Sequence, residues 1–352
     1  GGERAASPGP GAAAAARRGG EGAPPGVAEG NVSVGNVSVG NTGSASSHRP
    51  PGSASSHGLR GSLPAADGSL GAKAATPSSS VGHLEGAAAL EPLFRRLKEL
   101  ESKGSGAVRV LQLGDSHTAS DYGTSVLRRR LQARFGDAGR GFIPLGEPYK
   151  RLFQDGELTS SGVDFRPEEV RPGRAGDGRY GLGGIAMVAT KPTARMVSRY
   201  GASAASLELA YLEQPGGGSF DLLVDGKVLR IETRQPAVRS AFRLLDVDDK
   251  PHTVEVRARG DGEVRIFGIA LESRRPGIVV DSLGINGAKA HDALGLDEPH
   301  VVEQLRHRGS ALVIFAYGTN ECGDGTSPEE HERALVALAG RVQRAGGAAC
   351  LF

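Results

Sequence analysis

The chain has 352 residues, of which 38% are hydrophobic, so it is long enough to bury at least one sizeable core. Its 42 basic and 40 acidic side chains leave a formal net charge of +2, which gives no electrostatic reason to expect nucleic acid or an anionic membrane as a partner. No apolar run approaches the roughly 20 residues that a membrane-spanning helix needs. With 2 cysteines, the sequence predicts neither a disulfide framework nor a zinc cluster.

Residues 1–84 have the composition of a flexible tether. Gly, Ala, Pro and Ser dominate this segment, and no aromatic residue precedes Phe94. Two short repeats also occur there, Gly30–Val34 recurring at Gly35–Val39 and Gly43–His48 recurring at Gly52–His57. Such a segment cannot bury enough apolar surface to offset the entropy of ordering it. We therefore expect it to be disordered.

Residues 85–150 predict the first part of an α/β domain. Leucines at helical spacing among charged residues predict an amphipathic helix within 84–103. The apolar residues 108–113 predict a short strand. A tight turn at 114–117 then leads into a helix that ends at Gly136.

Residues 151–275 predict an all-β insertion. Short apolar segments, many of them alternating, are separated by turn signals at 225–226 and 260–262. The segments are Ser206–Glu213, Ser219–Val224, Lys227–Glu232, His252–Arg259 and Val264–Leu271. Strands at such regular spacing are typical of a β-sandwich.

Residues 276–352 return to alternating strands and helices. Strands at 278–281 and 311–316 flank a helix that ends near His307. Ser327 then begins another helix as its N-cap, followed by a proline and a capping-box glutamate. Alternating strands and helices indicate a parallel sheet that is covered on both faces. The sequence therefore predicts an α/β domain interrupted by the all-β insertion.

Ser116 directly follows the first predicted strand and begins a helix. A hydroxyl at that point lies at the carboxyl edge of the sheet, beside unpaired backbone N–H groups, where open α/β sheets place their sites. A serine there can attack an acyl carbon while its own N–H donates to the developing oxyanion. The tripeptide Gly114–Ser116 also fits an ordinary turn, in which Ser116 caps the helix and Asp115 shapes the turn.

Two further loops follow predicted parallel strands. Gly287 lies after the strand 278–281, and its missing side chain lets the backbone approach a substrate. Asn320 follows the strand 311–316, and its amide can donate to an oxyanion, a contribution of roughly 3 kcal/mol. Alone, these residues also fit a turn glycine and a loop-capping asparagine. Because such loops converge at one edge of a parallel sheet, their occurrence together with Ser116 favours an active site.

These motifs resemble the first three conserved blocks of the SGNH/GDSL hydrolases. The matching residues are Gly114–Ser116, Gly287 and Gly318–Asn320, and the resemblance covers residues of about 105–145 and 277–352. Within that superfamily, Asp121 and Gly139–Phe142 are similar to peptidoglycan O-acetylesterase-like proteins, which carry a carbohydrate-binding-like sandwich inserted in the hydrolase domain. The resemblance implies a three-layer α/β/α, flavodoxin-like parallel sheet.

The resemblance also implies roles for the matching residues. Ser116 would be the nucleophile, and the backbone N–H groups of Ser116 and Gly287 would form the oxyanion hole with the Asn320 amide. Asp115 would shape the turn. Since neighbouring residues on a turn point apart, His117 is interpreted as a shaping or substrate-facing residue rather than the base.

The family places its base in a late Asp-x-x-His block, which this sequence lacks. The block would follow the strand that begins at Ala348, and the sequence stops at Phe352 within that apolar run. Matches at 249–252 and 297–300 lie in the wrong places and are interpreted as coincidences. We expect both ends of the sequence to be artificial, including the start at Gly1 without a signal segment, and the truncated chain to be close to inactive.

The resemblance implies an extracytoplasmic bacterial serine esterase that removes O-acetyl groups from a cell-wall glycan or polysaccharide through an acetyl-serine intermediate. Two alternatives stay open: an acetyltransferase that uses the same site, and a non-catalytic glycan-binding protein on a degenerate scaffold. The absence of tryptophan disfavours a sugar-stacking platform, although Tyr200, Tyr211 and Phe220 are candidates. An acetylated glycan is the expected partner. No metal or other cofactor is expected, and the oligomeric state stays open.

Overall fold

The computed structural model describes residues 35–38, 83–84, 86–149, 155, 157–171 and 176–351. Of the predicted tether, only strands β1 (Gly35–Ser38) and β2 (His83–Leu84) fall among these residues, so its expected disorder lies outside the described part of the chain. Across the described ranges, no helix is both long enough and apolar enough to cross a membrane.

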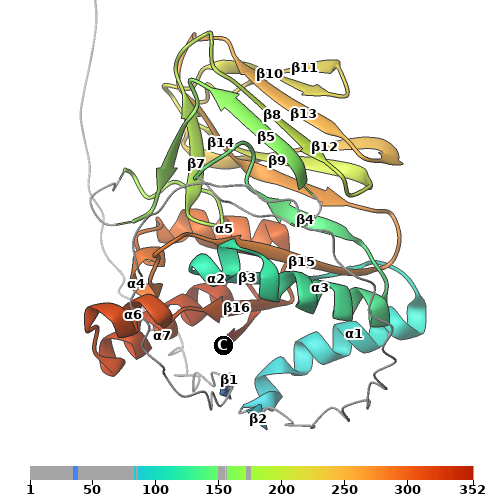
Figure 1. The fold of residues 1–352 in the computed structure, drawn as a ribbon, viewed down its shortest axis with the longest axis vertical. Helices are drawn as coiled ribbons and strands as arrows, with labels where there is room; N and C mark the ends of the chain where they lie inside the picture. Colours follow the sequence, from blue (N-terminus) through green and yellow to red (C-terminus); the bar gives the residue numbers. More distant parts are fainter. Residues whose placement is uncertain are drawn as a thin grey trace, which may run out of the picture. The chain divides into compact units, whose positions relative to one another are not determined.

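A parallel sheet contains the strands predicted on both sides of the insertion (Figure 1). Its order is β15-β3-β16-β17, followed by β1 and β2. The first four strands are β3 (Ala107–Gly114), β15 (Gly277–Gly284), β16 (Leu312–Ala316) and β17 (Ala348–Leu351). Gly114 pairs with both Gly284 and Ala316, the last residues of the neighbouring strands. Because the three strands end in register, the loops that follow them leave from the same edge.

Helices cover both faces of this sheet. Successive side chains of a strand point to opposite faces, so each strand contributes to two apolar layers. Val108 and Val110 of β3 pack on one face, toward α1 and α3. Leu111 and Leu113 pack on the other, toward α5 and α7. The helices are α1 (Glu91–Lys103), α3 (Tyr122–Phe135), α5 (Glu298–Arg308) and α7 (Pro328–Arg344). A turn of 3-10 helix, η1 (Ala87–Leu90), directly precedes α1. The predicted mixed α/β fold with a parallel sheet is confirmed.

Most helix ends follow local sequence signals. α7 begins after the N-cap Ser327, whose hydroxyl accepts from the Glu330 N–H at 3.2 Å. α3 ends at the predicted Gly136. The helix expected after the first strand is instead divided into α2 (Ser116–Ala119) and α3, because Asp121 between them has a left-handed φ of 54°.

Two antiparallel sheets contain the strands predicted for the insertion (Figure 1). Their orders are β11-β10-β13-β8-β5 and β12-β9-β14-β7-β6. The strands are β5 (Glu157–Val163), β6 (Arg166–Glu169), β7 (Ile185–Ala189), β8 (Arg195–Tyr200), β9 (Ala204–Glu213), β10 (Ser219–Val224), β11 (Lys227–Glu232), β12 (Arg239–Lys250), β13 (Thr253–Ala258) and β14 (Val264–Glu272). Met196, Leu209 and Val256 belong to one apolar core that both sheets share, so the sheets form a sandwich.

The aromatic residues considered for sugar stacking lie inside this sandwich. Tyr200, Tyr211 and Phe220 are all buried, and Tyr211 packs edge-on against Phe220. The suggestion that they present a stacking surface is therefore wrong. They lie on β8, β9 and β10, and their side chains belong to the inward-facing set of each strand, which builds the shared core.

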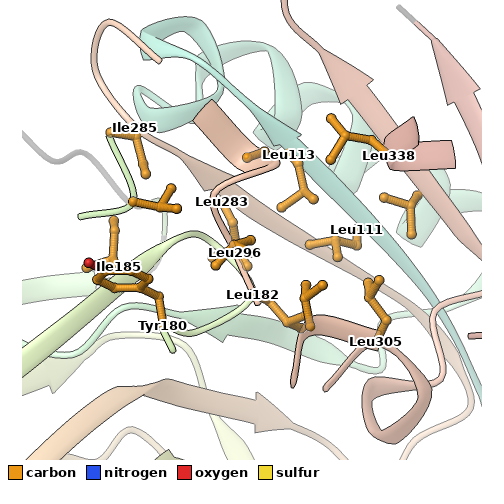
Figure 2. Packing of buried hydrophobic residues seen from close by; sticks show 14 of the residues in the cluster. Leu111, Leu113, Tyr180, Leu182, Ile185, Leu283, Ile285, Leu296, Leu305 and Leu338 are labelled. Carbon is orange, nitrogen blue, oxygen red and sulfur yellow. The ribbon is translucent and has the colours of Figure 1, made fainter. Parts of the chain in front are cut away.

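The sandwich packs against the parallel sheet and includes a strand from outside the predicted insertion. β4 (Gly139–Ile143), which follows α3, pairs with β14 of the sandwich. Figure 2 shows Tyr180 and Leu182, from the segment before β7, packed in the same cluster as Leu111 and Leu305. The domain boundaries 85–150, 151–275 and 276–352 stay a prediction.

A buried ion network joins the same parts. Asp281 of β15 is 0% exposed and accepts from the Arg308 guanidinium at 2.7 and 2.8 Å, and from the Phe142 N–H at 2.6 Å. Arg308 also donates to Glu272 at 2.6 Å. Glu272 in turn accepts from Arg109 at 2.7 and 2.5 Å. Two carboxylates thus connect β3, β4, β14, β15 and α5.

Candidate active site

Ser116 occupies the first position of α2, just beyond the end of β3. Asp115 is the N-cap of this short helix: its carboxylate accepts from the His117 N–H at 2.9 Å and lies 3.1 Å from the ring nitrogen Nδ1 of His117. Asp115 is buried, whereas the His117 side chain is 73% exposed. A backbone N–H at a first helical position has no partner within its helix. Neither this N–H nor the Ser116 hydroxyl forms a hydrogen bond with another residue that the structure describes.

Glycines let α2 lie close to the neighbouring strands. A Cβ at Gly284, the last residue of β15, would collide with the Asp115 carbonyl oxygen and the Ala119 nitrogen. A Cβ at Gly114 would collide with the side chain of Thr118 in the same helix. Glycine is therefore required at the ends of β3 and β15, and the turn that carries the serine lies directly against β15.

Gly287 lies in the loop between β15 and the short helix α4 (Ala290–Ala293). Its φ of 77° belongs to the left-handed region, which favours glycine. The carbonyl of the preceding residue, Asn286, accepts a hydrogen bond from Arg171 at 2.9 Å. Within the described part of the chain, no hydrogen bond uses the Gly287 N–H. This N–H is therefore available to a bound molecule.

Asn320 lies in the first turn of α6 (Thr319–Asp324), after β16. Its side-chain nitrogen Nδ2 donates to the Ala288 carbonyl at 2.8 Å, so the loop after β16 contacts the loop that contains Gly287. The structure thus brings the loops of Ser116, Gly287 and Asn320 to one edge of the parallel sheet.

Two further side chains hold these loops. Buried Glu321 accepts from the N–H groups of Ala290 at 2.7 Å and Gly318 at 3.0 Å, which joins the loops after β15 and β16. The Tyr149 hydroxyl donates to the Gly284 carbonyl at 2.7 Å. Burial raises the pKa of Tyr149, so the phenol stays protonated and remains a donor at neutral pH. Neither contact had a clear local signal, because the capping-box signature needs a polar N-cap side chain where this sequence has Gly318.

No family model and no curated protein matches this sequence. Among solved structures, the one described as "Peptidoglycan O-acetylesterase in action, 5 min" is similar with a TM-score of 0.59 and 25% identity, over 74% of this chain and 70% of that chain. The chain is similar in fold to a peptidoglycan O-acetylesterase. This similarity confirms the resemblance expected from the motifs.

Other solved structures are much less similar. A two-domain esterase active on acetylated mannans is 15% identical, with a TM-score of 0.22 over 26% of this chain and 28% of that chain. A family two carbohydrate esterase from Clostridium thermocellum is 10% identical, with a TM-score of 0.21 over 47% of this chain and 73% of that chain. At these TM-scores the likeness does not establish a shared fold.

In this peptidoglycan O-acetylesterase-like fold, two cavities flank α4. A cavity of about 530 Å³ is lined by polar side chains that include Lys289, Glu321 and His331. A second, of about 300 Å³, lies between α4 and the segment after β6, where Arg171 and His291 line it. Pockets of roughly 300–1,000 Å³ hold small ligands, so each has room for a sugar unit.

The two Asp-x-x-His matches have structural contacts elsewhere. His252 is buried in the sandwich, with Nδ1 2.9 Å from Asp225. Asp297 caps α5 by accepting from the His300 N–H at 3.0 Å, and the His300 ring nitrogen Nε2 lies 3.0 Å from the Tyr180 carbonyl. Burial lowers the pKa of His300. These contacts agree with the interpretation of both matches as coincidences.

Proposed function

We propose that this chain belongs to a serine esterase of the SGNH/GDSL type, which removes O-acetyl groups from a cell-wall glycan or a related polysaccharide. The observation that carries the proposal is the meeting of three loops at one edge of the parallel sheet. The strands end in register at Gly114, and Asn320 bonds the loop that contains Gly287. The similarity in fold to a peptidoglycan O-acetylesterase supports the substrate class.

In the proposed reaction, Ser116 Oγ attacks the acetyl carbonyl carbon while the serine proton passes to a base. The carbonyl π electrons move onto oxygen, and the bond to the sugar oxygen then breaks. The base gives its proton to the departing sugar oxygen, which leaves an acetyl-serine. Water, deprotonated by the same base, attacks this ester and releases acetate, and the serine hydroxyl is restored.

The available donors suit stabilisation of the oxyanion. The N–H groups of Ser116 and Gly287 form no hydrogen bond with the described residues. Asn320 donates one N–H to Ala288 and has a second one on the same nitrogen. Donors that are already held in place need no reorganisation when charge develops, which is why such groups contribute strongly to catalysis.

The base stays a prediction that rests on the resemblance. We propose a histidine of an Asp-x-x-His block that follows the strand beginning at Ala348. A serine without its base is little more reactive than an ordinary alcohol, so activity is to be tested in the full-length protein. We also propose an extracytoplasmic location and a carbohydrate-binding role for residues 151–275, both of which follow from the same substrate class.

The fate of the acetyl group separates the proposed function from its alternatives. The full-length protein, incubated with O-acetylated peptidoglycan, is expected to release free acetate. Transfer of acetyl to an added unacetylated glycan would instead identify an acetyltransferase. If neither product forms although the protein cosediments with the insoluble glycan, the binding-protein alternative is correct.

Asn320→Ala is expected to lower kcat by about 10²-fold to 10³-fold with a smaller effect on KM, because it removes a donor that acts mainly in the transition state. Steady-state kinetics with a small acetyl ester would measure this. Cys322→Ala, at an exposed position in the same helix, serves as the control and should retain full activity. Unchanged kcat in Asn320→Ala would remove this residue from the oxyanion hole.

A further inference from the structure

Arg171 reaches from the sandwich to the proposed oxyanion hole. It lies two residues after β6, and its Nη1 donates to the Asn286 carbonyl at 2.9 Å. The same nitrogen lies 3.4 Å from the point that a Cβ on Gly287 would occupy. The Arg171 side chain is 35% exposed, so it lies at the rim of the site rather than in the core.

The carbonyl that Arg171 binds belongs to the same peptide unit as the Gly287 N–H. A peptide unit is planar and almost always trans, so its C=O and N–H point in opposite directions. Fixing the Asn286 oxygen therefore fixes the direction of the Gly287 N–H. A hydrogen bond from a charged donor is also stronger than a neutral one, and it polarises the peptide so that its N–H becomes a better donor.

Glu169 holds the guanidinium in place for this contact. Its Oε2 accepts from Arg171 Nε at 2.8 Å and lies 2.7 Å from Nη2, which leaves Nη1 for Asn286. Glu169 is only 4% exposed, and it pairs with Ile185 of β7 at the edge of the sandwich. The direction of the guanidinium is thus set by a buried carboxylate on a regular strand.

We propose that Arg171 is a positioning residue for ester hydrolysis, which holds and polarises the Asn286–Gly287 peptide so that its N–H faces the developing oxyanion. This inference rests on the proposed function of the site. The arginine comes from a segment predicted as part of the inserted sandwich, so the insertion would complete the oxyanion hole as well as bind glycan.

The test compares Arg171→Ala with Arg171→Lys and wild type in the full-length protein. Arg171→Ala is expected to lower kcat about 10-fold to 100-fold, less than the loss of a whole oxyanion donor, with KM within about twofold of wild type. Arg171→Lys keeps a charged donor but lacks the planar guanidinium that can bind Glu169 and Asn286 together, so its kcat should lie between those of Arg171→Ala and wild type. Guanidinium chloride at non-denaturing concentration should raise the activity of Arg171→Ala but not of wild type.

Two controls guard against a change in folding. Arg166→Ala removes an exposed arginine of the same segment that pairs with Glu168, and it should leave kcat unchanged. The double variant Glu169→Gln/Arg171→Ala replaces the buried carboxylate with a neutral amide, so the loss of Arg171 leaves no unpaired buried charge at this position. This variant should melt near wild type and still show the low kcat.

The amide proton resonance of Gly287 gives a readout that does not depend on activity. It is expected to shift in Arg171→Ala, because the peptide loses a charged hydrogen bond, and to stay in place in Arg166→Ala. An unchanged Gly287 resonance, or an unchanged kcat in an active enzyme, would overturn the proposal for Arg171. A raised KM with unchanged kcat would also overturn it, since that result assigns Arg171 to substrate binding. Absence of esterase activity in the wild type, with the resonance shift observed, would instead refute the proposed function alone.

Discussion

Ser116→Ala is expected to lower kcat for acetyl release by about 10⁴-fold to 10⁶-fold in the full-length protein, because it removes the hydroxyl that forms the proposed covalent intermediate. Binding of the glycan should persist, since the hydroxyl contributes little area to the site. Acetate release from O-acetylated peptidoglycan and from a small acetyl ester would measure the loss.

A matched control for this variant lies four residues along the chain. Ser120 donates its hydroxyl hydrogen to the His117 carbonyl at 2.8 Å, and Ser120→Ala should leave kcat close to wild type. Acid quenching during turnover, followed by peptide mass spectrometry, should find an acetyl group on the peptide that contains Ser116. Full activity of Ser116→Ala, or the acetyl group on a different peptide, would refute the nucleophile assignment.

Asp281→Ala is expected to lower the free energy of unfolding by about 3–5 kcal/mol, because it leaves the buried Arg308 charge without its main partner. The variant also removes the acceptor of the Phe142 N–H, 2.6 Å away. Urea unfolding followed by circular dichroism would measure the change. An unchanged dependence of the unfolding free energy on urea concentration would show that the folded and unfolded states keep their compactness.

An exposed ion pair provides the comparison for this stability prediction. Asp246 and Arg274 are 3.1 Å apart, and both side chains are mostly exposed to solvent. Asp246→Ala is therefore expected to cost about 0–1 kcal/mol. Equal losses in the two variants would show that the Asp281 network stabilises the fold no more than an exposed ion pair does.

Elements with strong local signals were predictable from the sequence. β10 and β11 have the predicted bounds because their turn, at Asp225 and Gly226, has positive φ values of 49° and 84°. That combination is the one that a tight hairpin requires. The capping box of α7 gave its start in the same way. In these cases the information lies within four residues of the boundary.

Elements that depend on distant partners were missed. β12 is an edge strand whose side chains are mostly exposed, so it lacks the apolar alternation that identifies β9. The break between α2 and α3 occurs at Asp121, whose buried carboxylate accepts from Arg128 at 2.8 Å and Arg140 at 3.1 Å. Arg140 lies 19 residues from Asp121, and neither its approach nor the burial of Asp121 can be read from the local apolar pattern.

The candidate site also has some features that the local sequence predicts and others that depend on distant contacts. The positions of Ser116, Gly287 and Asn320 after three strands were predictable, because parallel strands end at a common edge. The contact of Arg171 with Asn286 joins residues 115 positions apart in the chain. It had no signal in either local sequence, and only the packing of the sandwich against the parallel sheet creates it.

The pairing of β4 with β14 limits how this protein can be re-engineered. Only residues 273–276 separate β14 from β15, so the chain passes directly from the sandwich to the parallel sheet. Replacing the sandwich would leave β4 without the strand that it pairs with, and would expose the buried Ile143, which packs in the sandwich core. An exchange of sandwich segments must therefore retain β14 and be made at hairpins such as the one between β10 and β11, neither of which pairs with β4 or β14.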